Sequence, residues 1–335
     1  MSATTTRRAL GLAALSGLLL AVVFLGFALG ARPVPLAAVI DALASPVPGD
    51  PDHTVVRELR VPRTLIGVAA GAALGLAGAV IQGATRNPIA DPGILGLGAG
   101  ASLAVVVAIT WLGVGSPSGY AWFAVAGTAV AALVVFGIGA LGRDGAAPAR
   151  LALVGAAFTA AATSLTTLVL LGDLDTLDRY RFWVVGSLAG RDAGTLVAVL
   201  PLLLAGAIVA LGTGRALDAM ALGDDVARGL GHRLGLARVA CAVAVVLLCG
   251  GATALVGPIV FVGLITPHLA RRLAGPDHRW ILRYSPVLGA IVLVSADVVG
   301  RLIAPPGELE AGIVLALVGA PVMIAVVRRT RAAAL

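Results

Sequence analysis

Long apolar stretches follow one another along almost the whole chain, and the short segments between them hold most of the charges. Most stretches are close to the ~20 residues with which a helix crosses the hydrocarbon of a bilayer. The first is too long for a signal-peptide core, so a retained helix is expected. Ten helices are predicted in all, over residues 9–30, 64–84, 93–112, 120–141, 150–171, 194–211, 239–256, 258–270, 284–303 and 310–327. The pattern predicts an all-α, polytopic membrane protein with one transmembrane domain, residues 1–335.

The helix predicted over residues 258–270 is short for a membrane span. Thirteen residues reach only about 20 Å, whereas the hydrocarbon layer is ~30 Å thick. Arginines cluster before residue 239 and after residue 270, and the positive-inside rule places both clusters in the cytoplasm. Residues 239–270 therefore leave and return, either as two crossings or as a re-entrant hairpin hinged at Gly257-Pro258. Both alternatives place both termini in the cytoplasm, with outer loops at residues 31–63 and 172–192.

The amino-acid composition agrees with this arrangement and excludes one way in which the chain could hydrolyse ATP. Of the 335 residues 59% are hydrophobic and 12% are charged, against about 25% charged residues in a soluble domain. All 24 basic residues are arginines, and a phosphate-binding P-loop needs a lysine. ATP hydrolysis of that kind is therefore excluded from this chain. The arginines form no basic domain, so no nucleic-acid partner is expected.

Two polar segments have a composition that a simple connector does not need. Arg57, Arg60 and Arg63 lie within seven positions of the outer loop, either as a headgroup anchor or as a docking site for an acidic partner. Residues 212–238 alternate apolar and charged positions and are interrupted by glycines, which predicts short amphipathic helices. Such helices rest on lipid or contact a partner. The acidic pair Asp224-Asp225 favours a partner, because an anionic leaflet repels it.

The predicted spans hold few groups that could drive ion coupling or catalysis. Asp297, four residues before Arg301, is the main ionisable exception. Ion-coupled transporters usually place carboxylates or histidines near the midplane, although sodium sites made of backbone carbonyls stay open. Ser187 and His268 are expected on opposite sides of the membrane, so they cannot form a hydrolase pair. No catalytic residue and no metal site is predicted.

Five short blocks resemble, in the right order, the motifs of the FecCD permease family, the membrane subunits of ABC importers for ferric siderophores, haem and vitamin B12. The blocks are Arg60-Val61-Pro62-Arg63; Gly78, Gln82 and residues 86–96; residues 183–188; Leu222-Gly223 with Ala227 and Leu230-Gly231; and residues 257–264 with Pro267-His268 and Arg271. The likeness covers residues 55 to 327. One block departs from the family, since Glu310 replaces a proline and Leu315 a threonine, so no lining of the pathway is carried over for the tenth helix.

The resemblance implies the type II ABC importer permease fold in a bacterial cytoplasmic membrane. It implies a second permease subunit, identical or homologous, an extracytoplasmic binding protein, and two cytoplasmic subunits that bind ATP and Mg. This chain itself would hold no cofactor. A ferric siderophore is the expected cargo because it is the family's commonest; haem and cobalamin stay open, and an ion-coupled secondary transporter is the alternative of another class.

The resemblance also implies three sets of site residues. Arg60, Arg63 and Arg301 would pair with acidic residues of the binding protein. The coupling contact with the ATPases, within segment 212–238, would comprise Leu222, Gly223, Asp224, Asp225, Ala227, Leu230 and Gly231. A structural role is expected for Arg86, Asn87, Pro88, Asp91, Pro92, Gly257, Pro258, Pro267 and His268, of which the first five form a plain inner turn.

Overall fold

The computed structural model describes residues 3–141, 148–231, 233–305 and 307–332, and over these residues the protein is helical without a strand. The fold class predicted from the sequence is confirmed. The longer helices are α1 (Ala3–Ala28), α4 (Val61–Thr85), α5 (Leu97–Leu112), α6 (Pro117–Ala140), α7 (Pro148–Gly172), α9 (Ala193–Gly212), α12 (Leu234–Val256), α13 (Val262–Ala274), α14 (His278–Ile303) and α15 (Ala311–Ala332).

Seven helical segments among the described residues are long and apolar enough to cross a membrane. The other three predicted spans are shorter: α5, the apolar part of α15 over Ala311–Ala325, and α13, which has 13 residues. Helix α13 begins at Val262 and not at residue 258, because Gly257, at φ 78°, ends α12 and the next residues are not helical. The segment between α12 and α13 is therefore irregular, and the helix after it is shorter than predicted.

The connecting segments contain short helices that the apolar pattern did not predict. The segment over residues 31–63 folds into α2 (Leu36–Ala44), α3 (Pro51–Thr54) and a π-helix (Val55–Arg60) that runs directly into α4. The segment over residues 172–192 contains α8 (Leu174–Val184), whose first turn is capped by Asp173. A single helix over residues 93–112 was also wrong: a 3-10 turn (Pro92–Leu95) precedes α5, and Gly96 between them has φ 75°.

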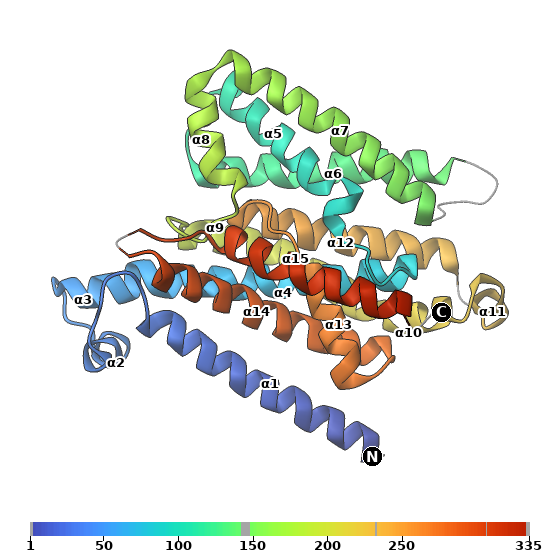
Figure 1. Cartoon of the computed structure of the whole chain (residues 1–335), viewed down its shortest axis with the longest axis horizontal. Coiled ribbons are helices and arrows are strands. Elements are labelled where there is room, and N and C mark those ends of the chain that lie inside the picture. The colour runs from blue at the N-terminus through green and yellow to red at the C-terminus, as the bar shows by residue number, and fades with distance from the viewer. Residues whose placement is uncertain (1–2, 142–147, 232, 306, 333–335) are drawn as a thin grey trace.

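Helix α4 lies at the centre of the bundle and packs against α14, α12 and α13. Helices α5 to α8 form a separate group on one side, and α1 lies along the opposite side against α14 (Figure 1). We call the two ends of the bundle the α3 end and the α11 end, after α3 and α11 (Asp224–Gly229); they lie at the left and the right of Figure 1. The start of α1 and the end of α15 both lie at the α11 end.

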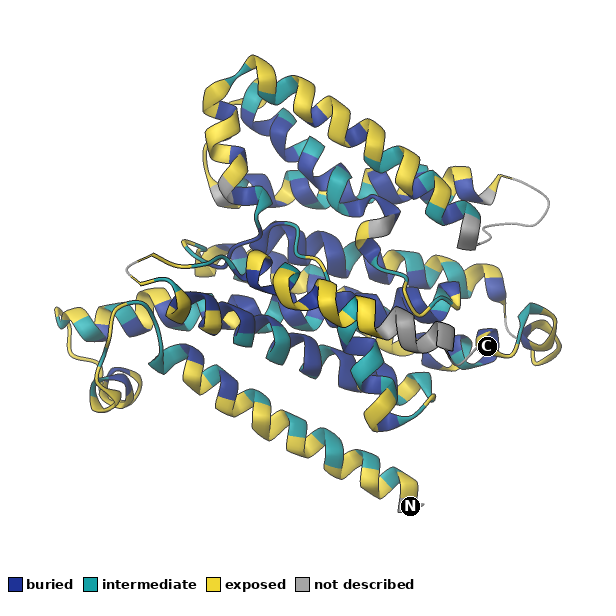
Figure 2. Cartoon of the chain, in the orientation of Figure 1, coloured by how far each residue is buried: buried dark blue, intermediate teal, exposed yellow. Residues whose placement is uncertain are grey.

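Exposed apolar side chains cover the flanks of the bundle, while α4 and α12 are mostly buried (Figure 2). Leu20, Leu133, Leu168 and Ile208 are among the exposed residues. Exposure of such a surface to water would be unfavourable, whereas lipid tails or neighbouring subunits would cover it without that cost. The distribution therefore fits a chain that is solvated by a bilayer.

Glycines bring the central helices into backbone contact. The Cα of Gly71 faces the carbonyl of Gly289 on α14, Gly75 faces that of Ser285, and Gly78 faces that of Gly263 on α13. A methyl group at any of the three would overlap backbone atoms of the other helix, which cannot rotate away. Small residues at such crossings let helices in a membrane approach closely.

Gly78→Ala should lower the free energy of unfolding of the purified chain by about 1–3 kcal/mol or more, because its new methyl group must push α13 away from α4. Gly137→Ala on α6 is the matched control, since nothing lies within 4 Å of the added carbon. Thermal unfolding in detergent measures both variants. Equal unfolding temperatures for the two would contradict this account of the packing.

Candidate functional site

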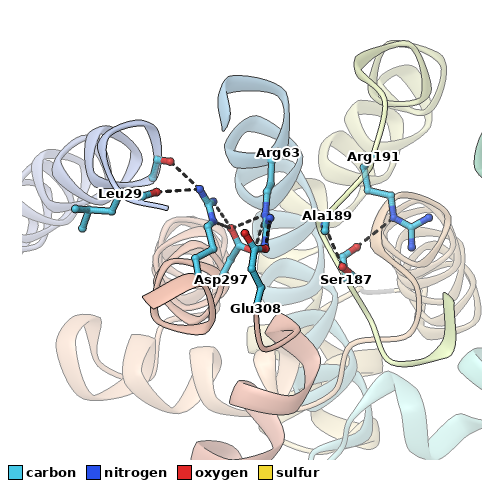
Figure 3. A network of polar contacts seen from close by, with 9 residues as sticks. Leu29, Arg63, Ser187, Ala189, Arg191, Asp297 and Glu308 are labelled. Atoms are coloured by element: carbon cyan, nitrogen blue, oxygen red, sulfur yellow. Dashed lines mark hydrogen bonds and ion pairs between the residues drawn. The ribbon is translucent and has the colours of Figure 1, made fainter. Parts of the chain in front are cut away.

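A network of charges occupies the α3 end and centres on Asp297 of α14 (Figure 3). One carboxylate oxygen, Oδ1, accepts from Nε and Nη2 of Arg63 at 3.0 and 2.7 Å. The other oxygen accepts from Nε and Nη2 of Arg301, one turn further along the same helix. Arg63 also donates through Nη1 to Glu308, at 2.6 Å. Two arginines and two carboxylates thus join α4, α14 and the segment before α15.

The same end of the bundle uses two arginines to cap α1. Arg301 donates through Nη1 to the carbonyls of Gly26 and Leu29, at 2.9 and 3.2 Å. Arg60 donates to the carbonyls of Phe27 and Ala28, at 3.1 and 2.6 Å. The last carbonyls of a helix have no partner within the helix and carry partial negative charge, so guanidinium groups stabilise them.

The three arginines expected to dock a binding protein therefore lie together, but they are mostly engaged within this chain. Arg60 is 5% exposed and Arg301 is 2% exposed, while the side chain of Arg63 is 12% exposed. A substitution of Arg60 by an acidic residue would therefore also remove the cap of α1. One contact of the network could be read from the sequence, because Asp297 and Arg301 are four residues apart. Nothing in the sequence indicated that Glu308 takes part in it.

The residues predicted to contact the ATPases lie at the α11 end, in α11 and in the turns on either side of it. Helix α10 (Gly214–Ala221) leads through Leu222 and Gly223 into α11. Gly223 has φ 104° and Gly231 has φ 82°, backbone conformations that other residues rarely adopt. The two glycines turn the chain into and out of α11, which projects from the bundle (Figure 1).

The projection exposes large apolar side chains beside charged ones. Leu222 and Leu230 are 64% and 62% exposed, and Val226 between them is also exposed, whereas Ala227 is fully buried. Asp225 is exposed and pairs with Arg228, three residues further along α11, at 2.8 Å. A contiguous exposed apolar patch on a segment rimmed by charges is typical of a protein interface.

Asp224 ties the projection to the bundle through two arginines. Its carboxylate lies 3.2 Å from Nη2 of Arg86 and 2.6 Å from Nη2 of Arg238. Arg86 ends α4 in a left-handed conformation, φ 51°, and starts the loop of residues 86–96. Arg238 lies on α12. The sequence singled out Asp224 and Arg86 separately, and Arg238 was not expected to be their partner.

The loop of residues 86–96 starts at the surface, and its second half, from Pro92, is mostly buried in the bundle. Asn87 Oδ1 accepts from the amide of Ile89 at 3.1 Å, and Asp91 Oδ1 from that of Gly93 at 2.8 Å, which makes the loop rigid. Asp91 and Pro92 line a small cavity together with residues of α12 and the segment after it, namely Cys249, Thr253 and Pro258. The 3-10 turn at the end of the loop packs against α7.

The remaining motif residues lie on or beside α13. Gln82 of α4 donates to the carbonyls of Gly263 and Leu264 and accepts from Arg271 at 2.5 Å. His268 Nδ1 lies 2.9 Å from the carbonyl of Leu264, one turn earlier. Gly257 passes close to the carbonyl of Trp183. These contacts fix α13 against α4 and leave no cluster of catalytic side chains among the described motif residues.

Known proteins resemble this chain in sequence and in fold. The model of the FecCD transport family matches residues 18–329. The chain belongs to the FecCD transport family. Its relatives include the ferric enterobactin transport system permease protein FepD of Escherichia coli (strain K12), 44% identical over 323 residues, which are 96% of each chain. The probable siderophore transport system permease protein YfiZ of Bacillus subtilis (strain 168) is 40% identical over 281 residues, 84% of each chain.

A solved structure has the same fold. It is described as an inward-facing conformation of a metal-chelate type ABC transporter, is 25% identical and has a TM-score of 0.81. The match covers 96% of this chain and 99% of the other. With the apolar helices described above, this FecCD-family chain is a multi-pass membrane protein.

Asp297→Asn should destabilise the chain by about 3–5 kcal/mol, because it leaves the buried guanidinium of Arg301 without its carboxylate. Asp178→Asn is the matched control: Asp178 also pairs with an arginine, at 3.3 Å, but both side chains are at least 60% exposed, so its loss should cost less than about 1 kcal/mol. Chemical unfolding of the two purified variants measures the difference. A loss for Asp297→Asn no larger than that of the control would show that the network is not a structural tie.

Proposed function

We propose that the chain is the membrane-spanning permease subunit of an ATP-binding-cassette importer and passes a ferric siderophore into the bacterial cytoplasm. The observation that carries this proposal is the match over 96% of both chains to the permease of a ferric enterobactin system. The chain has no lysine for a P-loop, so ATP is bound and hydrolysed, with Mg, by two separate subunits. Haem and cobalamin complexes are the alternative cargoes.

The α11 end is the cytoplasmic end in this proposal. It holds both termini and most of the arginines that the positive-inside rule assigns to the cytoplasm. The exposed apolar residues Leu222, Val226 and Leu230 would seat α11 in the ATPase subunit. Such helix-in-groove contacts depend on a few buried apolar anchors.

The ion pair between Asp224 and Arg86 would pass the movement of α11 into the bundle. Arg86 begins a loop that is stiffened by two prolines and two side-chain caps, and this loop ends against α7. A wide groove of about 880 Å³ follows α7 and is lined by Thr159, Thr163, Ser164 and Thr167. Alanine and leucine side chains complete the lining. Because this large groove is open at the surface and carries several hydroxyl groups, we assign this face to the pathway between this chain and a second permease, identical or homologous.

The α3 end is the extracytoplasmic end, where the binding protein delivers the cargo. Arg63 is the best exposed of the three predicted docking arginines, and it would meet an acidic side chain of that protein. Arg60 and Arg301 would contribute by holding the end of α1 and Asp297 in place beneath it. Docking and stability are therefore linked at this end.

Val226→Asp tests the proposed function. In vesicles that contain the complete assembly, wild-type uptake of ferric siderophore should require ATP and the ATPase subunits. The variant should bind the ATPases at least about 30-fold more weakly and lose uptake, because a charge enters an apolar seat. Val47→Asp is the control, since Val47 is equally exposed but lies at the other end. ATP-dependent uptake that survives Val226→Asp would contradict the coupling assignment.

Arg86→Gln tests the transmission of movement separately from binding. We expect ATPase subunits to bind and hydrolyse ATP, while uptake per ATP falls by roughly 2- to 30-fold, the range of energies that such links carry. Arg272→Gln, an exposed arginine at the same end, should change neither quantity. Unchanged uptake per ATP in Arg86→Gln would mean that α11 moves α7 by another route.

A further inference from the structure

A second polar pocket opens at the α3 end, beside the loop that joins α8 to α9. Its volume is about 430 Å³, and it is lined by Tyr120, Arg179, Trp183, Ser187, Arg191 and Glu310, among others. None of these residues belongs to the Asp297 network. They come from the start of α6, from α8 and its following loop, and from the segment before α15.

Arg191 is the central charge of this pocket. Its Nε donates to the carbonyl of Ser187 at 3.1 Å, and that bond fixes the plane of the guanidinium group. Figure 3 shows the two terminal nitrogens extending beyond Ser187, and neither makes a hydrogen bond to the described residues. Partial burial lowers the pKa of Arg191 from its ordinary value, yet a guanidinium stays protonated in proteins. The group is thus a partly buried cation whose two terminal nitrogens have no acceptor among the residues that the structure describes.

The other charges leave the pocket positive. Arg179 is exposed at its rim and adds a second cation, while Glu310 supplies one carboxylate near Arg191. Glu310 makes no ion pair within 4 Å among the described residues, and its carboxylate acts on Arg191 only from a greater distance. Among the residues that line the pocket there are two cations and one anion, while Asp173 lies outside it near Arg179.

The floor of the pocket is aromatic. Tyr120 and Trp183 are buried, and Trp183 stacks at 6.2 Å between ring centres on Tyr180. A fixed guanidinium offers parallel donors to two oxygens of one planar group, and an aromatic wall favours a flat ligand. Carboxylate, salicylate and catecholate groups have this shape and charge.

We propose that this pocket is a receiving subsite that binds an anionic oxygen-donor group of the incoming ferric chelate, with Arg191 as the principal contact and Arg179 as the second. The proposal rests on the proposed function and extends it, because it assigns the cargo a negative charge. The recess favours a small ligand: an acidic side chain of a partner protein would reach the exposed arginines of the same end first.

Direct binding tests the proposal without requiring transport. The purified full-length chain is placed in phosphatidylcholine nanodiscs and titrated with ferric enterobactin, a negatively charged tris-catecholate, and with ferrioxamine B, a positively charged hydroxamate. Arg191→Gln should weaken the binding of ferric enterobactin by about tenfold or more. It should leave ferrioxamine B unchanged or bound more tightly. Arg179→Gln should weaken ferric enterobactin less, because that side chain is exposed.

Two further variants distinguish a specific loss of binding from a general loss of folding. Glu310→Gln removes the opposing carboxylate and should tighten the binding of ferric enterobactin by severalfold, a gain that a damaged fold cannot produce. Arg181→Gln is the control, since Arg181 is equally exposed on α8, pairs with Asp178 and does not line the pocket. Its affinity should equal that of the wild type.

Several outcomes would overturn the proposal. They are no measurable binding of ferric enterobactin by the wild type, equal affinity in Arg191→Gln, or an equal loss for both chelates. If added phosphatidylglycerol removes the effect of Arg191, the pocket holds a lipid headgroup; if Arg191→Gln loses only the binding protein, it holds an acidic side chain. Wild-type vesicles that import no ferric siderophore with ATP would instead contradict the proposed function and leave the binding result intact.

Discussion

At the α3 end one buried carboxylate, Asp297, meets two guanidinium groups, and the positions of helices α1, α4 and α14 and of the segment before α15 depend on that contact. Arg301 shares Asp297 with Arg63 and uses its other donors on the last carbonyls of α1, so the charges and the helix end satisfy one another. A charge or an open carbonyl at this depth would otherwise be very costly, because lipid offers no replacement partner. The charged side chains near the ends of the membrane spans therefore stabilise the fold of this chain.

The same constraint, that lipid offers no partner for a polar group, applies to the rest of the bundle, which meets it through close packing of helices. Helices α4, α13 and α14 meet at glycines, so the interior is made of backbone contacts and small side chains. Many of the polar groups that are not needed for these ties lie at the two ends and along α7, while buried hydroxyl groups such as those of Thr128 and Thr266 donate to carbonyls of their own helices. A rigid centre with one projecting segment, α11, suits a chain that transmits movement from a partner. It does not suit one that generates movement by binding ions at its midplane.

The sequence predicted the long helices because an apolar stretch of ~20 residues is a strong signal, and it predicted α10 and α11 because their apolar positions recur with a helical period. It could not predict α2, α3 or α8, which are short, partly polar and stabilised by caps such as Asp173. The depth of the loop of residues 86–96 depends on how closely α4 and α13 approach, and the partners of Arg60 and Arg301 lie far away in the chain, at the end of α1. The family motifs located these residues but not their contacts.

The central claim is that this chain moves cargo only when a separate ATPase drives it. The most direct measurement uses the purified chain alone in sealed vesicles, with a proton or sodium gradient imposed and radioactive iron bound in a siderophore outside. The account predicts no accumulation under either gradient, and accumulation once the ATPase subunits, the binding protein and ATP are supplied. Gradient-driven accumulation by the chain alone would contradict it.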